Sequence, residues 1–216
     1  MKENKTDWQA IFFDFDGVIA DSTAVKMRAF STLFAPYGPR VQEAVVRYHM
    51  ENGGMPRRDK IRHCFTAFVG HPVDDETLKR QGQTFADMVR DEVIAAPYID
   101  GALETLQFLL QSATPCFVVS GTPEEEMRDI VIRKGLTPYF LEVHGSPRVK
   151  TEIVADILQR HCLTPKRCLF IGDALADYQG AQNNGLAFLG IVPQGQPCIF
   201  PETVSTSASV QLIPMK

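Results

Sequence analysis

Residues 11–22 read IFFDFDGVIADS, an apolar run that meets Asp14 and Asp16, one residue apart, before apolar residues resume after Gly17. The short run, rich in β-forming residues, predicts a buried strand that ends at the two aspartates. Carboxylates beside a buried strand are costly unless a cation accompanies them. The stretch therefore predicts a strand whose carboxyl end presents acids to a bound cation.

Short apolar runs of the same kind recur along the chain, and each ends in small or acidic residues. They cover residues 10–17, 115–122, 139–146, 168–174 and 186–193. Helical signals lie between the later runs, at residues 122–135, 150–162 and 175–185. Thr122, Pro123 and Glu125 are typical of an N-cap, a first-turn proline and a capping-box acid. This alternation predicts an α/β fold with a doubly wound parallel sheet.

The alternation breaks after the first run, where residues 22–97 show helical periodicity without a strand. A structureless crossover of about 75 residues would be unusually long, so this segment predicts an inserted helical domain. We expect a Rossmann-like core of residues 1–21 and 98–216 and a helical cap of residues 22–97. Asp21 and Ser22, at the start of the insertion, are typical of a helix N-cap.

Charge and composition exclude several classes of partner. The formal net charge of −4 gives no electrostatic footprint for nucleic acid or for an anionic membrane surface. The five cysteines show no CxxC spacing, which favours reduced thiols. No apolar run approaches the roughly 18 residues of a membrane span, and the polar N-terminus lacks the apolar region of a secretory signal. We expect a cytoplasmic protein, either a monomer or a homodimer.

Acidic, hydroxyl and basic residues follow the predicted strands at the places where ligands bind such a sheet, outside the carboxyl ends of the strands. They are Asp14 and Asp16, Ser120, Gly121 and Thr122, Lys150, and Asp173 with Asp177. Several carboxylates and a lysine in one crevice suit Mg²⁺, which prefers few carboxylates, several waters and substrate phosphate oxygens. A carboxylate is also a nucleophile toward a phosphoryl group when cations offset the repulsion between the two anions. The hydroxyl and backbone N–H groups of residues 120–122 would hold phosphoryl oxygens.

The segments DFDGV, SGT, Lys150 and GDALAD together resemble the four motifs of the haloacid dehalogenase-like (HAD) phosphohydrolase superfamily. The helical insertion directly after the first motif is similar to one branch of that superfamily. With the cap, the resemblance covers about residues 9–193. Such proteins have a Rossmann-like core, use Mg²⁺ and carry their substrate specificity on the cap.

The resemblance also implies roles for individual residues. Asp14 would be the nucleophile that becomes an aspartyl-phosphate, and Asp16 the acid that protonates the leaving oxygen and then activates water. Asp14, the backbone carbonyl of Asp16 and Asp173 would hold Mg²⁺, with Asp177 orienting them. Ser120, Gly121 and Lys150 would bind the transferring phosphoryl group. Thr151 stands where the family often has proline, so whether Arg148 shares the role of Lys150 stays open.

A basic segment in the cap is the second local signal. Residues 57–62 hold four cations, Arg57, Arg58, Lys60 and Arg62, against one acid, Asp59, and follow Gly53 and Gly54. A Gly-x-x-Arg arrangement resembles the cap segment of the family's sugar-phosphate members. One interpretation is that Arg57, together with Lys60, contacts a distal anionic group of the substrate. The alternative is a solvated basic helix face.

These features predict a Mg²⁺-dependent phosphatase that hydrolyses a small phosphorylated metabolite, such as a sugar phosphate, through an aspartyl-phosphate. A phosphomutase uses the same intermediate and is the nearest alternative. A non-catalytic phospho-aspartate switch module is a further alternative, although its reactive aspartate usually lies on the third strand and it carries no such cap. A dehalogenase is disfavoured because Asp16 occupies a position that is not acidic in that branch.

Overall fold

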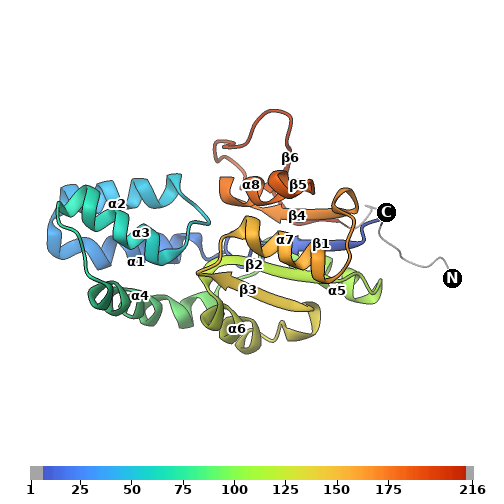
Figure 1. The fold of residues 1–216 in the computed structure, drawn as a ribbon, viewed down its shortest axis with the longest axis horizontal. Helices are drawn as coiled ribbons and strands as arrows, with labels where there is room; N and C mark the ends of the chain where they lie inside the picture. Colours follow the sequence, from blue (N-terminus) through green and yellow to red (C-terminus); the bar gives the residue numbers. More distant parts are fainter. Residues whose placement is uncertain (1–6, 213–216) are drawn as a thin grey trace.

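The computed structural model describes residues 7–212, which form a parallel α/β core and a helical cap (Figure 1). Six strands pair in the order β3-β2-β1-β4-β5-β6, and every neighbouring pair is parallel. Their bounds are β1 Ala10–Phe13, β2 Cys116–Pro123, β3 Glu142–Ser146, β4 Cys168–Gly172, β5 Ala187–Ile191 and β6 Ser205–Ser207. The predicted doubly wound sheet is confirmed. β1 lies between β2 and β4, where the connections reverse direction along the sheet.

Helices cover both faces of the sheet, because alternate side chains of β1 point to opposite faces. Phe12 stacks on Phe117 and Phe170 and packs on the side of α7 and α8, whereas Ile11 and Phe13 pack on the side of α5 and α6. These helices are α5 Ala102–Gln111, α6 Glu124–Arg133, α7 Lys150–Arg160 and α8 Leu175–Asn184. The near-continuous apolar run of β1 therefore fills two hydrophobic layers at once.

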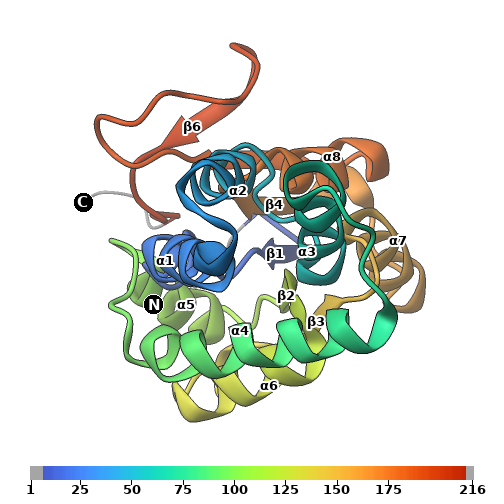
Figure 2. The same ribbon diagram turned by 90° about the vertical axis from the view of Figure 1, so that its left-hand side faces the viewer.

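The cap consists of four helices between β1 and α5: α1 Thr23–Phe34, α2 Pro39–Glu51, α3 Arg57–Cys64 and α4 Asp75–Ala95. It lies beyond the carboxyl ends of the strands, and its helices stand in front of the sheet in the end-on view of Figure 2. Aromatic rings fill its centre. The ring of Phe30 lies 4.6 Å from that of Phe85, and the ring of Phe34 lies 5.2 Å from that of Phe65. Aromatic burial of this kind gives the insertion a core of its own.

Two short segments join the cap to the core. Asp21 donates its backbone N–H to Pro97 (2.9 Å), and Ile99 donates to Ile19 (3.1 Å), so the outgoing and returning chains run side by side. Ala20 and Tyr98 form an antiparallel bridge between them. The cap is therefore tied to the core by one narrow double connection.

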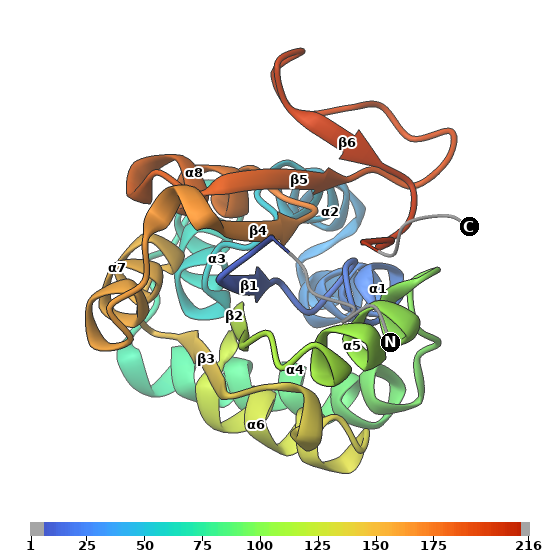
Figure 3. The same ribbon diagram turned by 90° about the vertical axis from the view of Figure 1, so that its right-hand side faces the viewer.

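The C-terminal segment returns to the core after β5. β6 forms the edge strand beside β5 (Figure 3). Val210 is fully buried beside α5, where its carbonyl accepts a 2.6 Å bond from the Thr105 hydroxyl. Across residues 7–212, no helix combines the length and the apolar character that membrane crossing requires.

Three local predictions differ from the structure. β2 extends through Pro123 and α6 begins at Glu124, so Thr122 does not cap the helix. Its hydroxyl instead contacts the Lys26 ammonium of the cap at 2.7 Å. Ser22 holds the N-cap position of α1 but donates its hydroxyl to Asp16 (2.6 Å). The strand expected from residue 139 begins at Glu142, after a 3₁₀ turn. This turn covers Thr137–Tyr139, and further 3₁₀ or π turns cover Ala35–Tyr37, Phe65–Val69 and Pro165–Arg167.

Candidate active site

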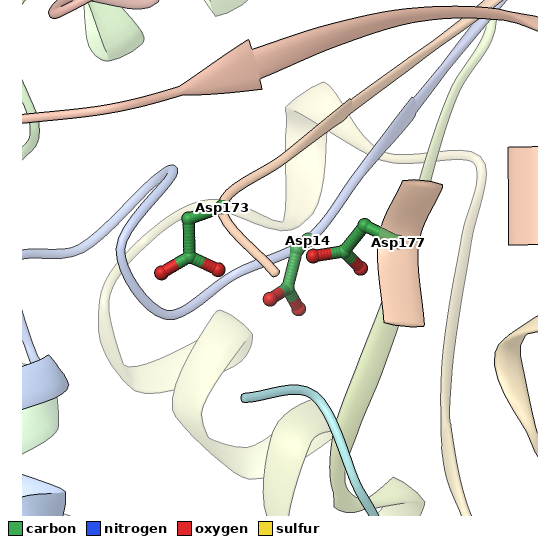
Figure 4. A group of neighbouring side chains, drawn as sticks. All are labelled: Asp14, Asp173 and Asp177. Atoms are coloured by element: carbon green, nitrogen blue, oxygen red, sulfur yellow. The ribbon is translucent and has the colours of Figure 1, made fainter. Parts of the chain in front are cut away.

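The motif residues meet at one edge of the sheet because the strands are parallel. Asp14 directly follows β1, Ser120 lies in the second half of β2, and Asp173 directly follows β4. Lys150 is the first residue of α7, and Asp177 lies in the first turn of α8. Figure 4 shows the carboxylates of Asp14, Asp173 and Asp177 gathered between the ends of β1 and β4. The sequence-predicted core residues thus form one site.

Three carboxylates crowd this site. Asp14, Asp173 and Asp177 each place one oxygen within 4.8 Å of the others. Burial, followed by the negative charges of Asp14 and Asp177, raises the pKa of Asp173 well above its ordinary value. Burial also raises the pKa of Asp177. Buried carboxylates that lie close together form a site that favours a cation.

Lys150 supplies part of the compensating charge. It is buried, and its Nζ lies 3.0 Å from Asp14 Oδ1 and 2.5 Å from Asp177 Oδ1. Although burial opposes a charged ammonium, these two carboxylates raise the pKa of Lys150 above its ordinary value. Asp177 is fixed in turn because its second oxygen accepts the backbone N–H of Ala174 (3.0 Å). Arg148 lies elsewhere: it pairs with Asp156 (3.3 Å) on the surface.

The remaining negative charge fits a divalent cation. Asp14 Oδ1 is buried and receives no hydrogen bond of acceptable geometry, despite its distance from Lys150. Asp173 has no cationic partner at ion-pair distance among residues 7–212. Oxygen donors only, with few carboxylates, are the ligands that suit Mg²⁺. The donor set therefore matches the expected metal.

Asp16 is held by the cap. Its Oδ1 accepts the Ser22 hydroxyl at 2.6 Å, and its Oδ2 contacts the Lys26 ammonium and lies 3.4 Å from the Thr122 hydroxyl. Burial alone would raise the pKa of Asp16, but Lys26 and Ser22 lower it below its ordinary value. The sequence interpretation did not include Lys26. Its spacing of four residues from Ser22, which places both on one face of α1, is the signal that could have revealed it.

Ser120 and Gly121 form the floor beneath the cap. Ser120 is buried, and its Oγ accepts the backbone N–H of Thr122 (3.1 Å). A Cβ on Gly121 would lie 2.6 Å from the carbonyl oxygen of Gly54 and 3.3 Å from that of Met55. Only glycine leaves room for the cap backbone at this distance from the core.

A cavity of about 400 Å³ lies between the cap and the core. Its floor includes Asp14, Asp16, Ser120 and Asp173, and its walls come mostly from α1, α2, α3 and the loop after β5. Binding sites for small molecules commonly have a volume of roughly 300–1,000 Å³. The reactive carboxylates therefore face a chamber that could hold a small substrate.

The basic cap segment divides into three environments. Arg58 and Arg62 pair with Asp75 on the surface. Arg57 lines the cavity but makes a bidentate pair with Glu126 of α6, at 2.7 and 2.8 Å. Lys60 also lines the cavity. The structure thus places Arg57 and Lys60 together, with the charge of Arg57 already compensated.

Comparison with known proteins agrees with this geometry. The sequence profile of the haloacid dehalogenase-like hydrolases matches residues 8–185. This chain belongs to the haloacid dehalogenase-like hydrolase family. The phosphoglycolate phosphatase of Vibrio vulnificus (strain YJ016) is 25% identical over 189 residues, which cover 84% of this chain and 82% of that protein. The 5'-nucleotidase of Pseudomonas aeruginosa is 29% identical over 202 residues, which cover 88% of this chain and 86% of that protein.

Solved structures show the same fold. The CbbY protein of Rhodobacter sphaeroides has a TM-score of 0.72 at 16% identity, with 94% of each chain covered. The beta-phosphoglucomutase of Clostridium difficile also has a TM-score of 0.72, at 17% identity, with 86% of this chain and 85% of that chain covered. The predicted resemblance and fold class are confirmed. The family match and its phosphatase relatives also confirm the predicted enzyme class, a phosphoric monoester hydrolase.

Proposed function

We propose that this chain is a Mg²⁺-dependent phosphatase that hydrolyses a small phosphorylated metabolite through an aspartyl-phosphate on Asp14. The observation that carries the proposal is the position of Asp14 at the cavity floor, beside Lys150 and two further carboxylates. A buried carboxylate with one oxygen lacking a hydrogen bond is poised to meet a phosphorus atom. The relatives named for phosphoglycolate and for 5'-nucleotides support a small phosphate monoester.

The reaction has two steps on the residues of this chain. A carboxylate oxygen of Asp14 attacks phosphorus, the bond from phosphorus to the ester oxygen breaks, and the protonated form of Asp16 gives its proton to the leaving oxygen. The contact with Lys26 favours the ionised form of Asp16, so Asp16 has to take up this proton before the first step. Asp16 then takes a proton from water, whose oxygen attacks the aspartyl-phosphate and releases phosphate and free Asp14. Ser120 and Lys150 hold the phosphoryl oxygens throughout. Mg²⁺, held by Asp14, Asp173 and the backbone carbonyl of Asp16, would neutralise charge on the phosphoryl group.

The division of labour follows the two parts of the fold. We assign catalysis to a core of residues 1–21 and 98–216, and substrate choice to a cap of residues 22–97. Residues 1–6 and 213–216 of that core lie outside the residues that the structure describes. The narrow connection near Ala20 and Tyr98 gives a hinge for closure, which would exclude bulk water from the cavity.

Phosphate release from a panel of phosphorylated metabolites tests the proposal. We expect release that requires Mg²⁺, disappears with EDTA, and is lost in Asp14→Asn. Asp7→Asn, which changes an exposed aspartate in the same way, is the matched control and should retain activity. Transfer of phosphate within a substrate without release would indicate the phosphomutase instead. A stable phosphorylated protein without turnover would indicate the switch module.

A further inference from the structure

The cavity contains one buried cation without a carboxylate partner. Three cationic side chains line it: Lys26, Arg57 and Lys60. Lys26 pairs with Asp16, and Arg57 pairs with Glu126. Lys60 is 3% exposed, and no carboxylate among residues 7–212 lies at ion-pair distance from it. A buried ammonium without a counter-ion is unfavourable, so the site as it stands favours an incoming anion.

The side chains that contact Lys60 carry no negative charge. Its Nζ lies 3.0 Å from Nδ1 of His49 and 5.5 Å from the centre of the Phe30 ring. Burial, then the charges of Lys60 and Lys26, lowers the pKa of His49 to about 3, so this histidine is neutral. Burial and then Lys26 lower the pKa of Lys60 itself to about 7. An anion beside Lys60 would restore its charged form.

Apolar side chains form a large part of the cap wall. Met27, Phe30, Met55 and Phe85 line the cavity around Lys60. A sugar carries several hydroxyl groups, and each would need a partner when buried. Among the cap side chains that line the cavity and are not exposed, the polar ones are Lys26 and Arg57, which already pair with carboxylates, His49, and Lys60 itself. The wall therefore favours an apolar group over a polyhydroxylated one.

The mouth of the cavity carries exposed apolar side chains beside the exposed polar side chains of Thr23, Glu51 and Gln196. Met50 of α2, Leu175 of α8 and Ile199 of the loop after β5 line it, and they are 64%, 40% and 50% exposed. They come from three separate elements and include three of the eight large apolar side chains exposed among the described residues. Convergence of exposed apolar side chains at a cavity indicates a ligand with an apolar part.

We propose that the substrate is a phosphate monoester whose leaving group combines an apolar body with one anionic group, that Lys60 binds this anion, and that the mouth residues Met50, Leu175 and Ile199 contact the apolar body. The proposal rests on the proposed phosphatase function and makes it more specific. It assigns Lys60, rather than Arg57, as the specificity-determining cation of the cap. A sugar phosphate, with neither feature, would be a poor substrate.

Four phosphate esters separate the two features: phosphoglycolate has the carboxylate alone, 2-phenylethyl phosphate the apolar body alone, the phosphate ester of 3-phenyllactate both, and glucose 6-phosphate neither. We expect the phenyllactate ester to have the highest kcat/KM, by about tenfold over each singly matched ester. Equal values for all four esters would overturn this inference while leaving the phosphatase intact. Absence of hydrolysis of every ester would instead overturn the proposed function.

Variants then assign the contacts. Lys60→Met should lower kcat/KM for both carboxylate esters by about tenfold or more, mainly through KM, and change that for 2-phenylethyl phosphate less than about threefold. Lys60→Arg keeps the charge and should keep the preference. Ile199→Ser should lower kcat/KM only for the two phenyl esters. Lys79→Met, at an exposed lysine of the cap, is the matched control and should have no effect.

A binding measurement makes the result independent of turnover. Calorimetry of Asp14→Asn with the phenyllactate ester should show binding that weakens about tenfold or more when Lys60→Met is added. The same loss for 2-phenylethyl phosphate would show that Lys60 supports the fold of the cavity and not an anion, which would overturn its assignment.

Discussion

The ion pair between Arg57 and Glu126 predicts a measurable coupling between the cap and the core. Arg57 of α3 and Glu126 of α6 are joined by two hydrogen bonds, and their side chains are only 7% and 9% exposed. The guanidinium also lies 4.5 Å from the centre of the Phe85 ring. Removal of one partner leaves the other charge buried without compensation, which costs about 3–5 kcal/mol.

We therefore expect Arg57→Met and Glu126→Leu each to lower the free energy of unfolding by about 3 kcal/mol, at the lower end of that range because the cap can open and rehydrate the remaining charge. The double variant has no unpaired charge, so it should lose far less than the sum of the single losses. The resulting coupling energy should be about 2 kcal/mol or more. Urea unfolding of the wild type, both single variants and the double variant measures it.

Two outcomes would refute this interpretation of Arg57. A coupling energy below about 0.5 kcal/mol would mean that the pair does not persist in solution. A selective rise of KM for anionic substrates in Arg57→Met, with normal kinetics in Glu126→Leu, would mean that Arg57 binds substrate, which is one of the two interpretations of the sequence pattern. We expect both variants instead to lower kcat/KM to a similar extent for every substrate, because both weaken closure of the cap.

Three further predictions concern single positions. Burial holds the pKa of Lys60 at about 7 against 10.5 in the unfolded chain. Above pH 7 the unfolded chain therefore binds more protons than the folded one, so the free energy of unfolding rises with pH. Urea titrations should show the wild type gaining about 3 kcal/mol of stability relative to Lys60→Met between about pH 7 and 9.5. An unchanging difference would contradict the burial of a charge. Gly121→Ala should lower kcat/KM by about tenfold, because its Cβ would meet the Gly54 carbonyl. Gly82→Ala, where a Cβ would meet open space, is the control and should not lower it. Equal kcat/KM values for the two variants would disprove the close contact between the cap and Gly121. Without Mg²⁺, Asp173→Asn should have a higher melting temperature than the wild type, because the substitution relieves repulsion between carboxylates. Mg²⁺ should raise the melting temperature of the wild type but not that of the variant. If Mg²⁺ also raised it in the variant, the metal would bind elsewhere.

Local sequence patterns were sufficient for the sheet and for the core of the site. The apolar runs around Phe12 and Phe170 required buried strands, and parallel strands bring their carboxyl ends to one edge. The strand pattern alone therefore places Asp14, Asp173 and Lys150 together. The same argument predicted the cap, because a long helical segment must bury its own apolar face.

Capping and charge pairing could not be predicted in the same way. Thr122 has the local context of an N-cap, yet its hydroxyl contacts Lys26, which lies 96 residues away in the sequence. Arg57 and Lys60 belong to one basic segment, and the sequence gives both the same candidate role. Only Arg57 meets Glu126, 69 residues further along the chain, because α3 of the cap lies against α6 of the core.

The sequence by itself determined the strands from β1 to β5, the helical character of the insertion, and the acids and lysine that meet at the carboxyl edge of the sheet, because hydrophobic periodicity and strand ends are local properties. The tertiary structure decided which cap cations keep a free charge and which side of the cavity is apolar. These properties depend on the distance between segments of the cap and the core, and no local pattern in either segment specifies that distance.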